Sequence, residues 1–417
     1  MHKKILHKFN NIEKKFDDDY VISKNSLYNL ILNKKFTHQK LSTIGFIKNL
    51  ILVVLSLITI FLCKIKRIKI ANYFIVHKNS NNYDNRSKYI LDNFNLKKSI
   101  NIVRCQSLKE SLKFYFFFPN VIFFMPIDYF NTFFLLKKKF LLENYKVIHK
   151  KELRNLKIFT VIFKFLKIKK FLSIDDLRVI QLFLKICKKL NISSYGYMHY
   201  KFSKYAPGIR YLCFDNFFVW SDFFKKKLIK VNKKYKYKKF FITGYPDKKN
   251  LRIKNKKVKI LYLLDLDLNF KKTIFFLKKL NSNKKVELFL KFKPQYRMLS
   301  DWRAFCKNHN IKYFENESLD YINKIYNMDY FVATVSTALL EATLYGAIPI
   351  KLMTSNDFAD DMIEDKIVLK AHNFKDIKRI IKNNNKKNLK SFFIKVWGKK
   401  KYQAQNVKKI LLKQFDQ

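Results

Sequence analysis

Short apolar runs of strand length alternate with helix-length segments along most of this chain, from Ile68 onward. Ile70–Val76 and Ile100–Val103 are predicted strands near the start of this alternation, and Tyr330–Ala333 is one near its end. Strands that alternate with helices build parallel sheets, because each connection has to return to the same end of the sheet. The pattern therefore predicts an α/β protein of two Rossmann-like domains, joined by the basic stretch Lys248–Lys257.

Further segments fit the same alternation. Ser87–Phe94 and the long amphipathic segment Leu172–Leu190 are predicted helices, and Val121–Pro126 and Tyr195–His199 are predicted strands. At 417 residues the chain is long enough for two domains with full cores. Ligands bind at the carboxyl ends of parallel strands, so a functional site is expected at those edges and in a cleft between the domains.

One stretch, Val332–Pro349, carries the most information about such a site. An apolar strand ends in Ser336-Thr337, and a helix pattern starts at once, with Glu341 one turn inside it and Gly346 at its end. Free amides at a helix N-terminus and the positive end of its dipole favour an anion. Ser336 and Thr337 are therefore candidates to bind a phosphate, or simply to cap the helix.

The charge of the chain is extreme, with a formal value of +56. Nucleic acid or an anionic membrane surface would be an obvious partner. However, Arg supplies only 10 of the 87 basic residues, and Lys, Asn, Ile and Phe are abundant while Gly is scarce. That profile is typical of a coding sequence biased toward A and T, which accounts for most of the basicity. The five cysteines form no CxxC pair, so neither a disulfide framework nor a zinc site is indicated.

An apolar segment, Ile44–Cys63, precedes the first domain and has Lys48 as its one charge. Its uninterrupted core is shorter than the roughly 20 residues that a spanning helix needs, and basic residues flank both sides. Three interpretations stay open: a helix lying in or dipping into the membrane, a spanning helix, or a buried helix of a soluble protein.

Several candidate residues fall where predicted strands end. His199 follows Tyr195-Gly196-Tyr197-Met198, and Lys291-Phe292-Lys293-Pro294 ends a strand of the second domain. A histidine has a pKa near neutrality, which suits a general base for an acceptor hydroxyl. Cations and hydroxyls suit the negative charge that builds on a departing phosphate. Lys293, Ser336 and Thr337 are the candidates for that role.

The order and spacing of these blocks resemble a family, the bacterial GT-B-type transferases of the CDP-glycerol glycerophosphotransferase and polysialyltransferase kind. Members of that family act in capsule, teichoic acid and surface-glycan synthesis. The blocks that carry the resemblance are Asn82–Phe94, Ile174–His199, Phe218–Trp220 with Phe224-Lys225, Gly244–Pro246, Lys291–Pro294, Ser336–Pro349 and Gly398–Leu412.

The resemblance implies a GT-B-like fold and transfer of a sugar or polyol phosphate from a nucleotide-activated donor, without a metal or other cofactor. Lys291, Lys293 and Gly244 would join Ser336 and Thr337 in donor binding, and Glu341 would hold the nucleoside. Two departures matter: Tyr200 stands where the family has Gly in its GxxHG signature, and Lys293 where it has His in KxHP. Lys293 keeps a cation there, but both changes leave an inactive homologue open.

Four domain segments follow: a membrane-associating helical segment over 1–67, an acceptor domain over 68–247, a donor domain over 248–388, and a C-terminal helix over 389–417 that crosses back to the first domain. The expected place is the cytoplasmic face of the inner membrane, with 44–63 as the attachment. The expected partners are the nucleotide-activated donor, a glycan or lipid-linked acceptor and an anionic membrane surface. A nucleotide-sugar 2-epimerase on the same fold and a membrane-attached nucleic-acid-binding protein are the alternatives.

Other motifs have simpler interpretations. Asp265-Leu266-Asp267 imitates a DxD metal motif, but it ends a predicted strand and is expected to bind no metal. Asp175 and Asp176 open the predicted helix, where carboxylates commonly cap free amides. Lys233–Phe241 interleaves cations and aromatics as single-strand binders do, and is expected to be a solvated loop and strand edge.

Overall fold

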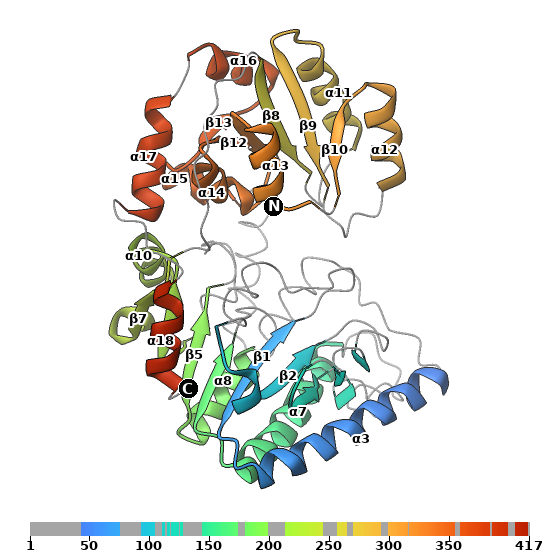
Figure 1. Cartoon of the computed structure of the whole chain (residues 1–417), viewed down its shortest axis with the longest axis vertical. Coiled ribbons are helices and arrows are strands. Elements are labelled where there is room, and N and C mark those ends of the chain that lie inside the picture. The colour runs from blue at the N-terminus through green and yellow to red at the C-terminus, as the bar shows by residue number, and fades with distance from the viewer. Residues whose placement is uncertain are drawn as a thin grey trace. The chain divides into compact units, whose positions relative to one another are not determined.

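The computed structural model describes residues 43–75, 93–104, 111–112, 115–116, 118–124, 126–127, 144–173, 180–198, 213–244, 257–264, 270–292, 299–315, 317–354, 359–383, 386–398 and 405–415. They form two compact units (Figure 1). The N-terminal domain holds the described residues up to Gly244 together with the last helix, α18 (Gln405–Phe415). The C-terminal domain holds those from Lys257 to Gly398.

A seven-stranded sheet forms the described part of the N-terminal domain, in the order β3-β2-β1-β4-β5-β6-β7, with every pair parallel. Its strands are β1 (Ile70–Ile75), β2 (Ile100–Arg104), β3 (Val121–Phe123), β4 (Lys170–Ser173), β5 (Ser193–Tyr197), β6 (Asn216–Val219) and β7 (Lys239–Ile242). Its helices are α3 (Thr43–Ile65), η2 (Leu96–Lys98), α7 (Asn144–Leu166), α8 (Ile180–Lys189), α10 (Asp222–Val231) and η4 (Lys233–Tyr237).

Aromatic rings fill both faces of this sheet. On one face Phe183 of α8 packs against Tyr73, Phe159 and Phe171, with ring centroids 5.1–5.3 Å apart. On the other face Tyr195 stacks on Phe218. Because side chains alternate along a strand, one sheet can bury both sets, and helices have to cover both faces.

The C-terminal domain holds a second parallel sheet, with the described order β10-β9-β8-β11-β12-β13. Its strands are β8 (Val258–Leu263), β9 (Val286–Lys291), β10 (Lys312–Phe314), β11 (Tyr330–Ala333), β12 (Ile348–Leu352) and β13 (Leu369–Ala371). Its helices are α11 (Phe270–Asn281), α12 (Leu299–Asn308), α13 (Leu319–Tyr326), α14 (Ala338–Ala342), η5 (Thr343–Tyr345), α15 (Asp361–Glu364), α16 (Phe374–Lys382) and α17 (Lys386–Trp397).

The α/β class and the two Rossmann-like sheets predicted from the alternation are confirmed. The helix predicted over Leu172–Leu190 is wrong at its start, because Leu172 and Ser173 belong to strand β4; its later part is confirmed as α8, described over Ile180–Lys189. The buried run Phe171–Ser173 has no helical period, and its length suits a central strand. The predicted helix Ser87–Phe94 lies almost wholly outside the described residues.

The segment after residue 385 contains two helices that belong to different domains. Gly398, with φ +82°, follows the end of α17, and α18 is described from Gln405, so the single helix expected over 389–417 is two helices. Trp397 of α17 donates a hydrogen bond from its indole Nε1 to Thr343 Oγ1 (3.0 Å) in the C-terminal domain. Phe415 of α18 instead packs against Phe94 and Tyr195, and Lys170 Nζ donates to Gln414 O (2.9 Å). The chain therefore returns to its first domain at its end (Figure 1).

Helix α3 lies on the N-terminal domain, beside the edge strand β3 and helix α7 (Figure 1). Its stretch Phe46–Ile65 is long and apolar enough to cross a membrane, yet only 28% of its most apolar window is buried. The core helix of a soluble protein would be mostly buried. Of the three interpretations of Ile44–Cys63, the buried helix of a soluble protein is therefore disfavoured.

Candidate functional site

The carboxyl edge of the C-terminal sheet gathers most of the predicted donor-binding residues that the structure describes. Lys291 is the last residue of β9, and Ser336 and Thr337 follow β11. Only β8 separates these two strands, which places them about 10 Å apart at the usual strand spacing. Because all the strands are parallel, their carboxyl ends meet at one edge.

The Ser336-Thr337 turn leads into helix α14, which is shorter than the sequence suggests. Only Ala338–Ala342 is α-helical, and the 3-10 turn η5 completes the segment before Gly346 reverses the chain with φ +77°. The first amides are already used: Ala338 N donates to Ser336 Oγ (3.3 Å), and Leu340 N donates to Thr337 O (2.9 Å). A helix of five residues also sums few peptide dipoles.

The hydroxyl groups of Ser336 and Thr337 are therefore better candidates to bind an anion than the backbone amides of this turn. Thr337 is half-buried, and its side chain makes no capping hydrogen bond to the helix. The bond to Ser336 Oγ is long, so a ligand could displace it at small cost. Glu341 lies one turn further on and is buried with 8% of its surface exposed.

Lys291 has partners within the protein. Its ammonium donates to Glu315 O (2.7 Å) and to Phe292 O (3.2 Å). Burial lowers the pKa of Lys291, and the nearby carboxylates of Glu317 and Glu315 oppose this only in part. This geometry makes Lys291 a residue that fixes the loop after β10.

A second lysine at this edge is one that sequence reasoning missed. Lys351 lies on β12, fully buried, and pairs with Asp360 (Nζ to Oδ1 3.1 Å) without the alignment of a hydrogen bond. Its backbone neighbour on β11 is Ala333, three residues before Ser336. The signal was present in the sequence: a lysine stands inside the apolar strand Ile348–Leu352, and an acidic pair follows at 360–361. A buried charge needs a partner, so such a lysine predicts a nearby carboxylate.

In the described part of the N-terminal sheet the carboxyl edge carries one charged residue, Arg104 at the end of β2, and neutral contacts at β5 and β6. Trp220 Nε1 donates to Tyr197 OH (3.2 Å), and Met198 N donates to Phe218 O (3.0 Å). Gly196 sits so close to the ring of Phe214 that a Cβ there would be 2.5 Å from it. Glycine is therefore required at this place in the strand that leads to His199.

Gly244 lies at the same edge, two residues after β7, with φ +73°. Thr243 Oγ1 donates to Val219 O (3.2 Å) or to Gly244 O (3.1 Å), which joins β7 to β6 just before this turn. His199 and Tyr200, like Lys293, Asp175, Asp176 and Asp265–Asp267, lie outside the described residues. Strand β5 ends at Tyr197, two residues before His199. The structure therefore describes the strand that leads to His199 but not the contacts of His199.

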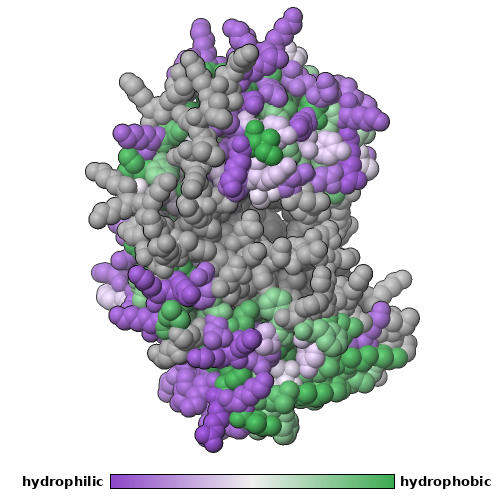
Figure 2. All heavy atoms as spheres, in the orientation of Figure 1, coloured by the Kyte–Doolittle hydropathy of each residue, from purple (hydrophilic) through white to green (hydrophobic). Residues whose placement is uncertain are grey.

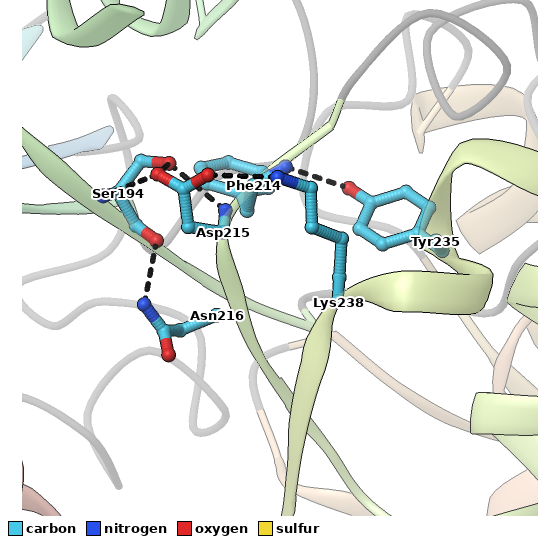
Figure 3. A network of polar contacts seen from close by, with 6 residues as sticks. All are labelled: Ser194, Phe214, Asp215, Asn216, Tyr235 and Lys238. Atoms are coloured by element: carbon cyan, nitrogen blue, oxygen red, sulfur yellow. Dashed lines mark hydrogen bonds and ion pairs between the residues drawn. The ribbon is translucent and has the colours of Figure 1, made fainter. Parts of the chain in front are cut away.

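A polar network lies at the opposite, amino end of the same sheet (Figure 3). Ser194 Oγ donates to Asp215 Oδ2 (2.7 Å), and Lys238 Nζ pairs with Asp215 Oδ1 (2.9 Å). Burial by itself would raise the pKa of Asp215, but hydrogen bonds from Lys238 and Ser194 outweigh burial and lower it. These residues stand at the starts of β5, β6 and β7, so the network aligns three strands and lies away from the candidate site.

The basic and aromatic stretch Lys233–Phe241 forms the 3-10 turn η4 and then strand β7 at the edge of the described sheet. Tyr235 is buried and its hydroxyl accepts a hydrogen bond from Phe214 N (3.3 Å), whereas Tyr237 is exposed. The stretch is a turn and strand edge, as predicted.

No model of a known protein family matches the sequence, and no curated protein matches it either. Solved structures do match in fold. The calicheamicin glycosyltransferase CalG4 aligns with a TM-score of 0.54 and 8% identity, covering 84% of this chain and 99% of that one. A putative UDP-N-acetylglucosamine 2-epimerase from Listeria monocytogenes aligns with a TM-score of 0.50 and 13% identity, covering 84% and 97%. A glycosyltransferase from Rickettsia africae has a TM-score of 0.45 and 13% identity, covering 84% and 98%.

The two parallel sheets, together with the two neighbours that have TM-scores of 0.54 and 0.50, show a GT-B-like fold, as predicted. At such identities the likeness concerns the fold alone. Two of the three neighbours are glycosyltransferases and the third is a putative nucleotide-sugar epimerase, so the fold by itself does not identify the chemistry.

Proposed function

We propose that this protein is a glycosyltransferase, or a polyol-phosphate transferase, that moves a group from a nucleotide-activated donor to a surface glycan. The observation that carries the proposal is the carboxyl edge of the C-terminal sheet. There the hydroxyls of Ser336 and Thr337 follow one strand of a GT-B-like fold, and Lys291 ends another two strands away. Ligands of open α/β sheets bind at this edge.

In the proposed reaction an acceptor hydroxyl attacks the anomeric carbon of the donor sugar, or the phosphorus of a polyol phosphate. The bond to the nucleotide phosphate breaks, and the electron pair leaves with that phosphate. His199 takes the proton of the acceptor hydroxyl. Lys293 and the hydroxyls of Ser336 and Thr337 stabilise the negative charge on the leaving group, so no metal is needed. Glu341 holds the nucleoside, and Gly244 lets the backbone turn at the edge of the first domain.

The two lysines of the block Lys291–Pro294 have different parts in this proposal. Lys291 positions the loop, because its ammonium already binds two carbonyl oxygens. Lys293 is the donor ligand. The acceptor is a capsule, lipopolysaccharide or teichoic-type polymer, and the enzyme works at the cytoplasmic face of the inner membrane, where nucleotide-activated donors are made.

Donor binding can be tested by the thermal stability of the full chain with CMP, CDP, UDP, GDP and their sugars. We expect one nucleotide to raise the melting temperature and the Ser336→Ala/Thr337→Ala variant to lose that rise. Ser282→Ala is the control, because it removes a hydroxyl of the same domain at the amino edge of its sheet, where Ser282 Oγ donates to Lys279 O (3.1 Å). Equal loss in the control, or no response to any nucleotide, would contradict the proposal.

Catalysis needs a separate test. The His199→Ala variant should bind the donor like the wild type and lose transfer by roughly 10²- to 10⁴-fold, the usual contribution of a general base. Chromatography of a labelled glycan acceptor measures the transfer. Loss of donor binding in this variant would remove His199 from the proposed role.

A nucleotide-sugar epimerase is the second candidate, because the Listeria monocytogenes neighbour shares the fold with a TM-score of 0.50. An epimerase changes its substrate in the absence of any acceptor. NMR of UDP-N-acetylglucosamine incubated with the protein alone therefore separates the two: a new epimer supports this candidate, and an unchanged spectrum excludes that reaction. Salt-steep binding of any DNA or RNA without nucleotide binding would instead favour the charge-driven alternative.

A further inference from the structure

The two long helices of the N-terminal domain share an exposed apolar surface. On α3 large apolar side chains face outward along its whole length; they are Ile47, Leu50, Ile51, Val54, Leu57, Ile58, Phe61, Leu62 and Ile65. On α7 the exposed ones are Ile158, Val161 and Phe165. We name this set the α3–α7 surface; its α3 part is the green band at the lower right of Figure 2.

The two helices form one continuous surface because a groove joins them. The groove has a volume of about 460 Å³ and is lined by α3 residues such as Leu57 and Ile60 and α7 residues such as Ile158 and Val161. Phe61 and Phe165 bring the helices together further along, with ring centroids 6.3 Å apart. Monomeric soluble proteins rarely expose contiguous apolar patches of this kind, so the surface needs a partner.

Helix α3 is attached to the domain by its other side. The inner stripe Leu52, Ser56, Thr59, Ile60 and Cys63 is buried. Ser56 Oγ accepts a hydrogen bond from Phe123 N (3.1 Å) of strand β3, and Lys64 Nζ donates to Phe165 O (2.6 Å) of α7. A helix that crossed a bilayer would have to give up these contacts. The attachment therefore favours a helix that lies along the domain and presents only its outer half.

The charges around this surface are of one sign. Within 43–75 and 144–173 the one acidic residue is Glu152, which is buried. Exposed cations stand at both ends of α3 and within the outer stripe of α7; they are Lys48, Lys66, Arg67, Lys69, Arg154, Lys157 and Lys164. Long basic side chains can extend from an apolar surface to anionic head groups. A second copy of the chain would bring the same cations, so self-association through this surface is electrostatically disfavoured.

We propose that the α3–α7 surface docks in the plane of an anionic lipid bilayer, with α3 parallel to the membrane and lipid hydrocarbon filling the groove between the helices. Membrane attachment then takes two helices, 79 residues apart along the chain from Ile65 at the end of α3 to Asn144 at the start of α7, and needs no spanning segment. The membrane contact does not depend on the proposed function. Only its role in bringing the enzyme to lipid-linked acceptors rests on that function.

Flotation of the purified full chain with lipid vesicles tests the contact without any nucleotide. We expect binding to phosphatidylcholine vesicles containing about one-third phosphatidylglycerol to exceed binding to pure phosphatidylcholine by at least about tenfold, and to weaken with salt. The variant Leu57→Gln/Phe61→Gln/Val161→Gln should lose at least about tenfold of this binding. These three side chains are 56–67% exposed, so their replacement should not disturb the fold.

The matched control is Phe275→Gln/Tyr321→Gln/Ile325→Gln, which removes three side chains of similar exposure (51–61%) from the C-terminal domain. It should bind vesicles within about twofold of the wild type. If the α3–α7 variant binds as well as the control, or if anionic lipid makes no difference, the proposal fails. A concentration-dependent dimer in the absence of lipid, lost in the α3–α7 variant, would assign the surface to a second copy instead. Failure of nucleotide binding in the earlier experiment would leave this result untouched.

The orientation of α3 has its own measurement. Tryptophan placed in turn at Leu50, Leu57 and Ile65 samples the outer stripe from one end to the other, against the same native tryptophan background. Quenching by lipids brominated at different depths should report equal depth at all three positions for an in-plane helix. A deep position at 57 with shallow positions on both sides would show a spanning helix and overturn the proposal.

Discussion

The carboxyl edges of the two sheets differ in the side chains that they carry. In the C-terminal domain charged groups stand at the edge: Lys351 is fully buried beside Asp360, and Lys291 is half-buried on two carbonyl oxygens. In the described part of the N-terminal domain the same edge ends β2 in the half-buried Arg104, but at β5 and β6 it carries neutral contacts, such as Trp220 with Tyr197 and Gly196 against Phe214. The ion pair of Asp215 with Lys238 lies at the amino end of this sheet and is partly exposed.

This difference helps to distinguish lysines with a structural role from surface lysines that only reflect the composition of the chain. In a chain with 87 basic residues a surface lysine says little, whereas a buried lysine costs free energy that some contact must offset. Both lysines that the structure buries or half-buries at a sheet's carboxyl end belong to the domain proposed to bind the donor. We infer that buried charge stabilises the edge at β12, whereas close packing of neutral groups stabilises the edge at β5 and β6.

Breaking the buried pair should have the largest effect. Asp360→Ala leaves the Lys351 ammonium buried without its partner, which should cost about 3–5 kcal/mol of unfolding free energy. Urea unfolding, with hydrogen exchange of β11 and β12 peptides to localise the change, measures it. The double variant Lys351→Met/Asp360→Ala removes both charges and should recover most of the loss. If the double variant is no more stable than the single one, charge is not what organises this edge.

The counterpart in the N-terminal domain is a change of shape. Gly196→Ala adds a Cβ that would be 2.5 Å from the ring of Phe214, so β5 or the ring has to move, at roughly 1–3 kcal/mol. Phe214→Leu in the same chain should relieve part of this cost. Hydrogen exchange at β5 measures both. An unchanged stability of Gly196→Ala would show that the packing at this edge is loose.

Lys291 gives a smaller effect and tests its positioning role. Lys291→Met keeps the apolar stem but loses the hydrogen bonds to Glu315 O and Phe292 O, at about 1–2 kcal/mol. The nucleotide-induced rise in melting temperature should persist in this variant and be lost in Lys293→Met. If both variants lost the nucleotide-induced rise in melting temperature, Lys291 would also be a donor ligand.

The smallest effect is expected at the exposed pair. Asp215→Asn should cost about 0.5–1 kcal/mol at neutral pH, because solvent screens this partly exposed group. The folded state lowers the pKa of Asp215, so its stabilisation is present above the unfolded value of about 3.9 and is lost as pH falls through the folded value. The unfolding free energies of wild type and variant, measured in urea, should therefore converge as the pH falls below the lowered pKa of Asp215. A difference that persists there would contradict the charge-based explanation.

The sequence predicted the strands of the candidate site closely. Tyr330–Ala333 is a strand with the predicted bounds, and Gly346 ends the helical segment between it and the strand Ile348–Leu352. These features depend on local patterns: apolar runs, a glycine that accepts positive φ, and the order of elements. The helix between them was predicted as a full helix, but it is five α-helical residues and a 3-10 turn, since tertiary contacts such as Trp397 with Thr343 fix its end.

The sequence by itself determined the parallel α/β architecture, the two domains' order of strands along the chain, and an apolar segment before them. Only the tertiary structure decided which lysines are buried, that the segment after residue 385 is two helices belonging to different domains, and that α3 has one attached and one exposed face. The reason is physical. Periodicity records which residues share a face of a helix or strand, but burial and pairing depend on segments far apart in the chain, such as Phe123 with Ser56 and Phe415 with Phe94.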